Sequence, residues 1–142
     1  MTDPYNLQRF VNAQNGVFET ALAELRAGRK QGHWMWFVFP QLAGLGRSAT
    51  AQYYGIRSRE EARAYLEQPL LGSRLRQTIE ALLPWAGKRT AEEILGPIDA
   101  LKLRSCLTLF DAVQAGGLFD RALAIFYDGP DEQTLALLSQ SL

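Results

Sequence analysis

The chain has 142 residues, the usual size of one domain, and 47% of them are hydrophobic. Fifteen basic and fifteen acidic side chains give a formal net charge of zero, so the bulk attraction to phosphate that nucleic-acid-binding proteins use is absent. The one cysteine, Cys106, excludes a scaffold of intrachain disulfides. We therefore expect a single globular domain over residues 1–142 that does not bind nucleic acid.

The chain carries no recognisable targeting or membrane segment. Asp3 lies where a signal peptide would be positively charged, and no long apolar run follows it. The longest nearly continuous apolar run, Trp34 to Phe39, is far short of the roughly 20 residues that cross a bilayer. We therefore expect a cytoplasmic protein without a membrane partner, and a single thiol fits that reducing compartment.

Apolar residues recur mainly every three or four positions, and this period predicts an all-α fold. The first expected helix has Asp3 as its N-cap and Pro4 as its first residue, and ends at Asn15-Gly16. The second contains Phe18, Ala21, Leu22 and Leu25 on one face and ends before Gly28.

Later helices are predicted by capping signals and by proline and glycine. Residues 58–61 and 90–93 both match a capping box, in which a hydroxyl and a carboxylate bind exposed backbone N–H groups. Pro69 and Pro84 bound another helix, and the wide apolar surface after Pro97 predicts a central helix. With two helices after Gly116-Gly117, we expect about eight or nine short helices in one compact domain.

The segment from Arg29 to Arg47 holds the densest group of chemically useful side chains. Lysine and arginine can hold an anion, an indole can stack on a ring, and a glutamine amide can orient polar groups. The loop 44–48 also resembles part of a phosphate cradle, although it lacks the strand context of a P-loop or dinucleotide motif. The residues that we expect to bind a ligand here are Lys30, Trp34, Trp36, Gln41 and Arg47.

Some residues of this segment have a structural interpretation as well. His33 is the only histidine and can transfer a proton near neutral pH, but it also follows a helix C-terminus, where the helix dipole favours positive charge. Both interpretations of His33 stay open. Phe37, Val38 and Phe39 are expected mainly in the core, with Pro40 ending their element.

The expected central helix carries polar residues every three positions, at Asp99, Lys102 and Ser105. The first interpretation is a structural ion pair between Asp99 and Lys102. The second is the wall of a ligand site, with Tyr54 and Lys102 in the wall and Asp99, like His33, as a candidate for proton transfer.

No metal or cofactor is predicted. One cysteine and one histidine cannot supply the usual zinc ligands, and Cys106 falls in an apolar stripe that is typical of the core.

Several strings of the chain together resemble a bacterial family catalogued as domain of unknown function 1810, which genome annotation often labels calpastatin-like. The resemblance covers nearly the whole chain and implies a compact all-helical fold, but no established activity. The calpastatin label implies a disordered inhibitor, which this hydrophobic composition does not match. The strings that carry the resemblance are residues 3–11, 28–30, 33–48, 54–56, 71–75 and 99–102, among which His33-Trp34-Met35-Trp36-Phe37-Val38-Phe39-Pro40-Gln41 is highly specific.

Two functional hypotheses use the same residues. The aromatic and basic segment, with Leu71-Gly72-Ser73-Arg74-Leu75, is also similar to helical domains that handle ADP-ribose and related nucleotide derivatives. The first hypothesis is therefore a protein that binds or hydrolyses a phosphate-bearing, nucleotide-like small molecule. The alternative is a non-enzymatic helical module that binds another protein through exposed aromatic residues. The sequence does not indicate an oligomeric state.

Overall fold

The computed structural model describes residues 3–140, and these form a helical structure without a strand. The all-α prediction is confirmed. Two short helices, α3 and α4, bring the described α-helices to ten, against the eight or nine expected. The elements are α1 Gln8–Gln14, α2 Phe18–Arg26, α3 Met35–Val38, α4 Ala49–Tyr53, α5 Arg59–Glu67, α6 Pro69–Leu82, the 3-10 helix η1 Leu83–Trp85, α7 Ala91–Leu95, α8 Pro97–Val113, α9 Leu118–Phe126 and α10 Glu132–Gln140.

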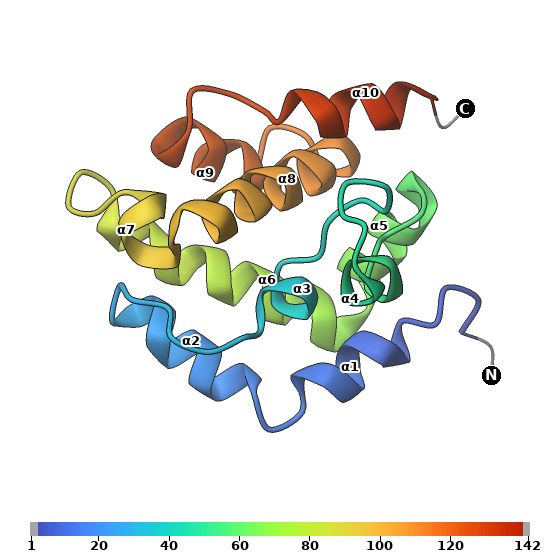
Figure 1. Ribbon diagram of the computed structural model, residues 1–142, viewed down its shortest axis with the longest axis horizontal. Helices are drawn as coiled ribbons and strands as arrows, with labels where there is room; N and C mark the ends of the chain where they lie inside the picture. Colours follow the sequence, from blue (N-terminus) through green and yellow to red (C-terminus); the bar gives the residue numbers. More distant parts are fainter. Residues whose placement is uncertain (1–2, 141–142) are drawn as a thin grey trace.

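Helix α8 is the central helix that its wide apolar surface predicts. It packs against α5, α7, α9 and α10, and Figure 1 shows α8 and α6 through the middle of the molecule, with α1 and α2 on one side and α9 and α10 on the other. Leu107 and Phe110 of α8 are fully buried, and so is Cys106, whose pKa is raised by burial. Within residues 3–140, none of the helices combines the length and apolar character needed to span a bilayer.

The helix starts follow the predicted caps at two of three positions. Thr90 and Glu93 form a complete capping box at α7. Ser58 caps α5 by accepting from the Glu61 N–H, although the Glu61 carboxylate accepts from the N–H of Arg57 instead of Ser58.

The prediction that the first helix starts at Pro4 is wrong. Helix α1 begins at Gln8, after Asn6 has taken a left-handed φ of 51°. The Asp3 carboxylate still acts as a cap, because it accepts from the backbone N–H groups of Leu7 and Gln8 at 2.8 and 3.0 Å.

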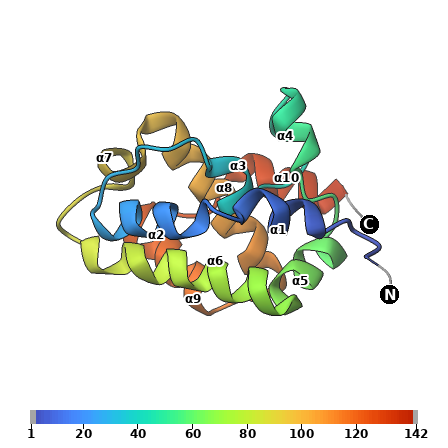
Figure 2. The same cartoon turned by 90° about the horizontal axis from the view of Figure 1, so that it is seen from below.

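The chain from Ala43 to Gly55 makes an excursion that carries α4. An isolated parallel bridge between Leu42 and Ile56 closes its base, with hydrogen bonds of 2.7 Å from Ala43 N to Ile56 O and 2.9 Å from Ile56 N to Gln41 O. In Figure 2, α4 projects from the body of the molecule. The bridge therefore fixes where this excursion leaves and rejoins the core.

Gly72 provides a test of the packing between α5 and α6. A Cβ at Gly72 would lie 2.1 Å from the carbonyl oxygen of Leu66, so the two helix backbones approach closely here. We expect Gly72→Ala to lower the free energy of unfolding by about 1–3 kcal/mol, measured by urea denaturation. An exposed helical Gly→Ala change would instead raise it by about 1 kcal/mol.

The matched control is Ser73→Ala on the exposed side of the same helix, expected to change stability by less than about 0.5 kcal/mol. A Gly72→Ala chain as stable as the parent would contradict the close approach.

Candidate functional site

A continuous chain of contacts joins five of the sequence-predicted site residues. Asp99 lies between two lysines, with Lys30 Nζ 2.9 Å from Oδ2 and Lys102 Nζ 3.2 Å from Oδ1. Lys30 Nζ lies 5.0 Å from the ring centroid of Trp34, and Lys102 Nζ lies 4.2 Å from that of Trp36. The expected Asp99–Lys102 pair is confirmed. Lys30, from the loop after α2, joins it. We call Lys30, Asp99 and Lys102 the lysine–aspartate cluster.

Lys30 is positioned by the turn that follows α2. Gly28 takes a φ of +74°, and a Cβ there would lie 2.6 Å from the Trp85 ring, so this turn requires glycine. The backbone N–H of Lys30 donates to the carbonyl of Ile94 at 2.7 Å, which fixes the loop to α7. The Lys30 ammonium also donates to the carbonyl of Gly32.

Glu24 of α2 holds the next part of the loop. Its Oε1 accepts from the N–H groups of Gln31 and Gly32 and from the indole Nε1 of Trp34, at 2.8 to 2.9 Å. Burial alone would raise the pKa of Glu24, but these N–H donors and the charge of Lys30 lower it below its usual value. Trp34 is only 1% exposed and packs against Phe39, so its indole is part of the core and its N–H is satisfied.

Trp36 brings the two ends of the segment from Arg29 to Arg47 together. It is half-buried, with Lys102 over its ring. A Cβ at Gly46 would lie 3.3 Å from Cη2 of Trp36 and 2.6 Å from Cβ of Ala51, so the loop 44–47 passes directly beside the indole. Arg47 follows this contact and is exposed. The loop 44–47 and Lys102 of the lysine–aspartate cluster therefore both lie against Trp36.

The other predicted residues are not joined to the cluster by a hydrogen bond, ion pair or ring contact among residues 3–140. His33 is exposed, next to the loop that Glu24 holds. Tyr54 is half-buried among Phe10, Phe37 and Tyr53, and burial and the neighbouring Tyr53 raise its pKa.

Gln41 is buried beside the Leu42–Ile56 bridge. Its side-chain Nε2 finds no hydrogen-bond partner among the described residues. A buried donor of this kind is normally satisfied by water or by a ligand, so Gln41 is the one residue of the predicted set with unused buried hydrogen-bonding capacity.

The cluster carries two ammonium groups and one carboxylate, and the Glu24 carboxylate also interacts with the charge of Lys30. Burial would raise the pKa of Asp99, but hydrogen bonds and charge from Lys30 and Lys102 outweigh this and lower it. A carboxylate held ionised by two cations is a weak base and has no proton to donate near neutral pH. Asp99 is therefore poorly suited to transfer a proton.

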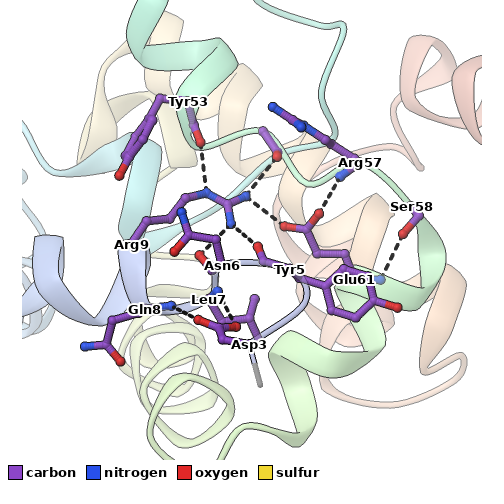
Figure 3. A network of polar contacts seen from close by, with 11 residues as sticks. Asp3, Tyr5, Asn6, Leu7, Gln8, Arg9, Tyr53, Arg57, Ser58 and Glu61 are labelled. Carbon is purple, nitrogen blue, oxygen red and sulfur yellow. Dashed lines mark hydrogen bonds and ion pairs between the residues drawn. The ribbon is translucent and has the colours of Figure 1, made fainter. Parts of the chain in front are cut away.

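Sequence reasoning missed a second polar centre, formed by Arg9 and Glu61. Arg9 Nη2 lies 2.7 Å from Glu61 Oε2, and both side chains are almost fully buried (Figure 3). The other Arg9 donors bind backbone carbonyls of Tyr5, Asn6, Tyr53 and Gly55. In the sequence Glu61 is predicted only as part of the capping box at residues 58–61, because its partner Arg9 is 52 positions away and leaves no local signal.

Among residues 3–140 no group of three or more histidine, cysteine, aspartate or glutamate side chains is placed to hold a metal ion. The site described above is thus one of lysines, a carboxylate, an indole and a glycine loop.

The chain belongs to the family described as "Protein of unknown function (DUF1810)", whose model matches residues 4–138. It is similar to a solved structure, the conserved hypothetical protein Rv1873 from Mycobacterium tuberculosis, with 52% identity and a TM-score of 0.89. The match covers 96% of this chain and 99% of that chain. No curated protein matches the chain. The family and fold are thus shown, and neither description states an activity.

The lowered pKa of Asp99 predicts a pH-dependent contribution to stability. Because the folded pKa is below the unfolded value of about 3.9, the ionised carboxylate stabilises the fold above that pH, and this is lost as the pH falls through the folded pKa. We expect Asp99→Asn to be less stable than the parent at pH 7, and the gap to narrow below about pH 4 in urea denaturation.

Asp111 is the matched control, because its pKa is shifted in the opposite direction from that of Asp99. Burial raises its pKa, so the parent should lose stability relative to Asp111→Asn as the pH rises through the titration of this group. A gap for Asp99→Asn that stays constant from pH 7 to about pH 3 would contradict the ionised lysine–aspartate cluster.

Proposed function

We propose that this chain is a bacterial cytoplasmic protein that binds a phosphate-bearing, nucleotide-like small molecule at the lysine–aspartate cluster. ADP-ribose or a close derivative is the first ligand to test. The proposal includes hydrolysis of this ligand, with His33, an exposed residue close to Lys30 in the sequence, as the group that transfers a proton.

The observation that carries the proposal is the convergence of Lys30 and Lys102 on one carboxylate beside the Trp36 ring. Lys30 interacts with both Asp99 and Glu24, whereas Lys102 donates only to Asp99 among the described residues, so the Lys102 ammonium keeps N–H donors for charge-assisted hydrogen bonds to a phosphate group. The ammonium groups are partly shielded from water, with 8% and 22% of the two lysine side chains exposed, so such bonds are stronger here than on an open surface.

Two further features fit a nucleotide-like ligand. The half-buried Trp36 indole can stack on a planar ring, and the glycine loop 44–47 beside it lets the backbone approach a ligand closely. The exposed guanidinium of Arg47 is available for a second phosphate.

The alternative function, a protein-interaction module, is favoured by one observation on the same helix. Ile98 and Leu101 of α8 are 69% and 63% exposed, and they immediately precede Asp99 and Lys102, respectively, in the sequence. Two exposed apolar side chains beside charged ones can form the centre of a small protein contact. On this alternative, ADP-ribose derivatives would leave the melting temperature unchanged.

The test is thermal denaturation and isothermal titration calorimetry of the full chain with ADP-ribose. A ligand at ~100 times its dissociation constant adds about 2.7 kcal/mol to the stability, which raises the melting temperature measurably. We expect Lys102→Met to weaken ADP-ribose binding roughly tenfold or more, because it removes a charge-assisted contact while keeping an apolar side chain against Trp36.

The matched control is Lys88→Met, which makes the same change at an exposed lysine between η1 and α7 and should leave the affinity unaltered. Equal affinities of the parent and the Lys102→Met chain would remove the cluster from the binding site.

A further inference from the structure

A separate cavity of about 320 Å³ lies where three segments of the chain meet, outside the lysine–aspartate cluster. Its wall comes from the residues before α1, from the end of α4, and from the first turn of α5, which the Arg9–Glu61 pair ties together (Figure 3). The volume is within the range of small-ligand pockets. The residues that line it are Pro4, Tyr5, Asn6, Arg9, Tyr53, Arg57, Ser58 and Glu61.

Arg9 itself has no hydrogen-bonding capacity left for a ligand. Its five N–H groups donate to four backbone carbonyls and to Glu61, at distances of up to 3.1 Å. The Glu61 carboxylate is neutralised by this pair and also accepts from the Arg57 N–H at 3.1 Å. The floor of the cavity is therefore a closed, neutral pair that sets its shape.

The unused capacity lies at the rim. The Arg57 guanidinium is exposed and makes no hydrogen bond or ion pair with the described residues, so its N–H donors and its charge are available. The Ser58 hydroxyl accepts from the Glu61 N–H at 3.0 Å and retains its own proton for a second partner. With Arg9 and Glu61 paired, Arg57 gives the cavity one net positive charge.

An aromatic surface lies beside these donors. Tyr53 is 55% exposed, and its ring is held edge-on by Tyr54, with ring centroids 4.8 Å apart. In Figure 3 the Arg57 side chain lies between Tyr53 and Ser58. An exposed ring supported from one side can receive a planar group on its free surface.

We propose that this cavity is a second binding site, for a small aromatic oxyanion whose charged group binds Arg57 and Ser58 and whose ring packs against Tyr53. A phosphate and a carboxylate share the necessary chemistry. The site is independent of the lysine–aspartate cluster, because no residue belongs to both.

The test uses phenyl phosphate and benzoate as probes, with benzyl alcohol as the uncharged ring of similar size, in calorimetric titrations of the full chain. We expect one or both anions to bind and benzyl alcohol to bind much more weakly. Backbone amide resonances of Asn6, Gly55 and Ser58 should shift on titration. Whichever of phenyl phosphate and benzoate binds more tightly identifies phosphate or carboxylate as the preferred group.

Arg57→Gln should weaken binding of the anion roughly tenfold or more, because it removes the positive charge and most of the N–H donors. Arg63→Gln is the matched control, with the same change of charge at an exposed position of α5, and should leave the affinity unaltered. Lys102→Met should also leave it unaltered, which separates this site from the one above. Failure of both anions to bind, or equal affinity for the parent and Arg57→Gln chains, would overturn the proposal.

Discussion

The arrangement of the candidate site depends on one partly buried interaction. The carboxylate of Asp99 is held between the ammonium groups of Lys30 and Lys102. It joins the loop after α2 to the central helix α8, and it places a cation against each of two indole rings. Removing the carboxylate would leave two like charges close together in a partly dehydrated place.

A second ion pair, between Arg9 and Glu61, forms a polar centre in which all the N–H donors of the arginine are bonded. Every Arg9 donor is used, and three chain segments converge on it, including the end of the α4 excursion. Every N–H of the Arg9 guanidinium is bonded, whereas the exposed Arg57 guanidinium makes no hydrogen bond with the described residues and the Lys102 ammonium donates only to Asp99 among them.

Local features of the sequence predicted local features of the structure. The capping box at Thr90, the central helix after Pro97 and the Asp99–Lys102 pair all depend on residues within one or two helical turns. The contact of Lys30 with Asp99 and the burial of Trp34 could not be predicted in this way. They depend on how α2, α7 and α8 pack and on Glu24, which accepts three N–H groups from the loop that follows α2, 7 to 10 positions further along the chain. The predicted helix start at Pro4 is wrong because Asn6 takes a left-handed φ, which cannot be part of an α-helix.

The most direct test of the anion site is a proton–nitrogen correlation spectrum of the chain, recorded while ADP-ribose is added. The three tryptophan indoles report on separate places: Trp36 lies under Lys102, Trp34 donates to Glu24, and Trp85 donates to the carbonyl of Leu25. The account predicts that the Trp36 indole resonance and the backbone amide of Gly46 shift together, while the Trp85 indole stays in place. Shifts confined to other regions, with Trp36 unchanged at saturating ligand, would contradict it.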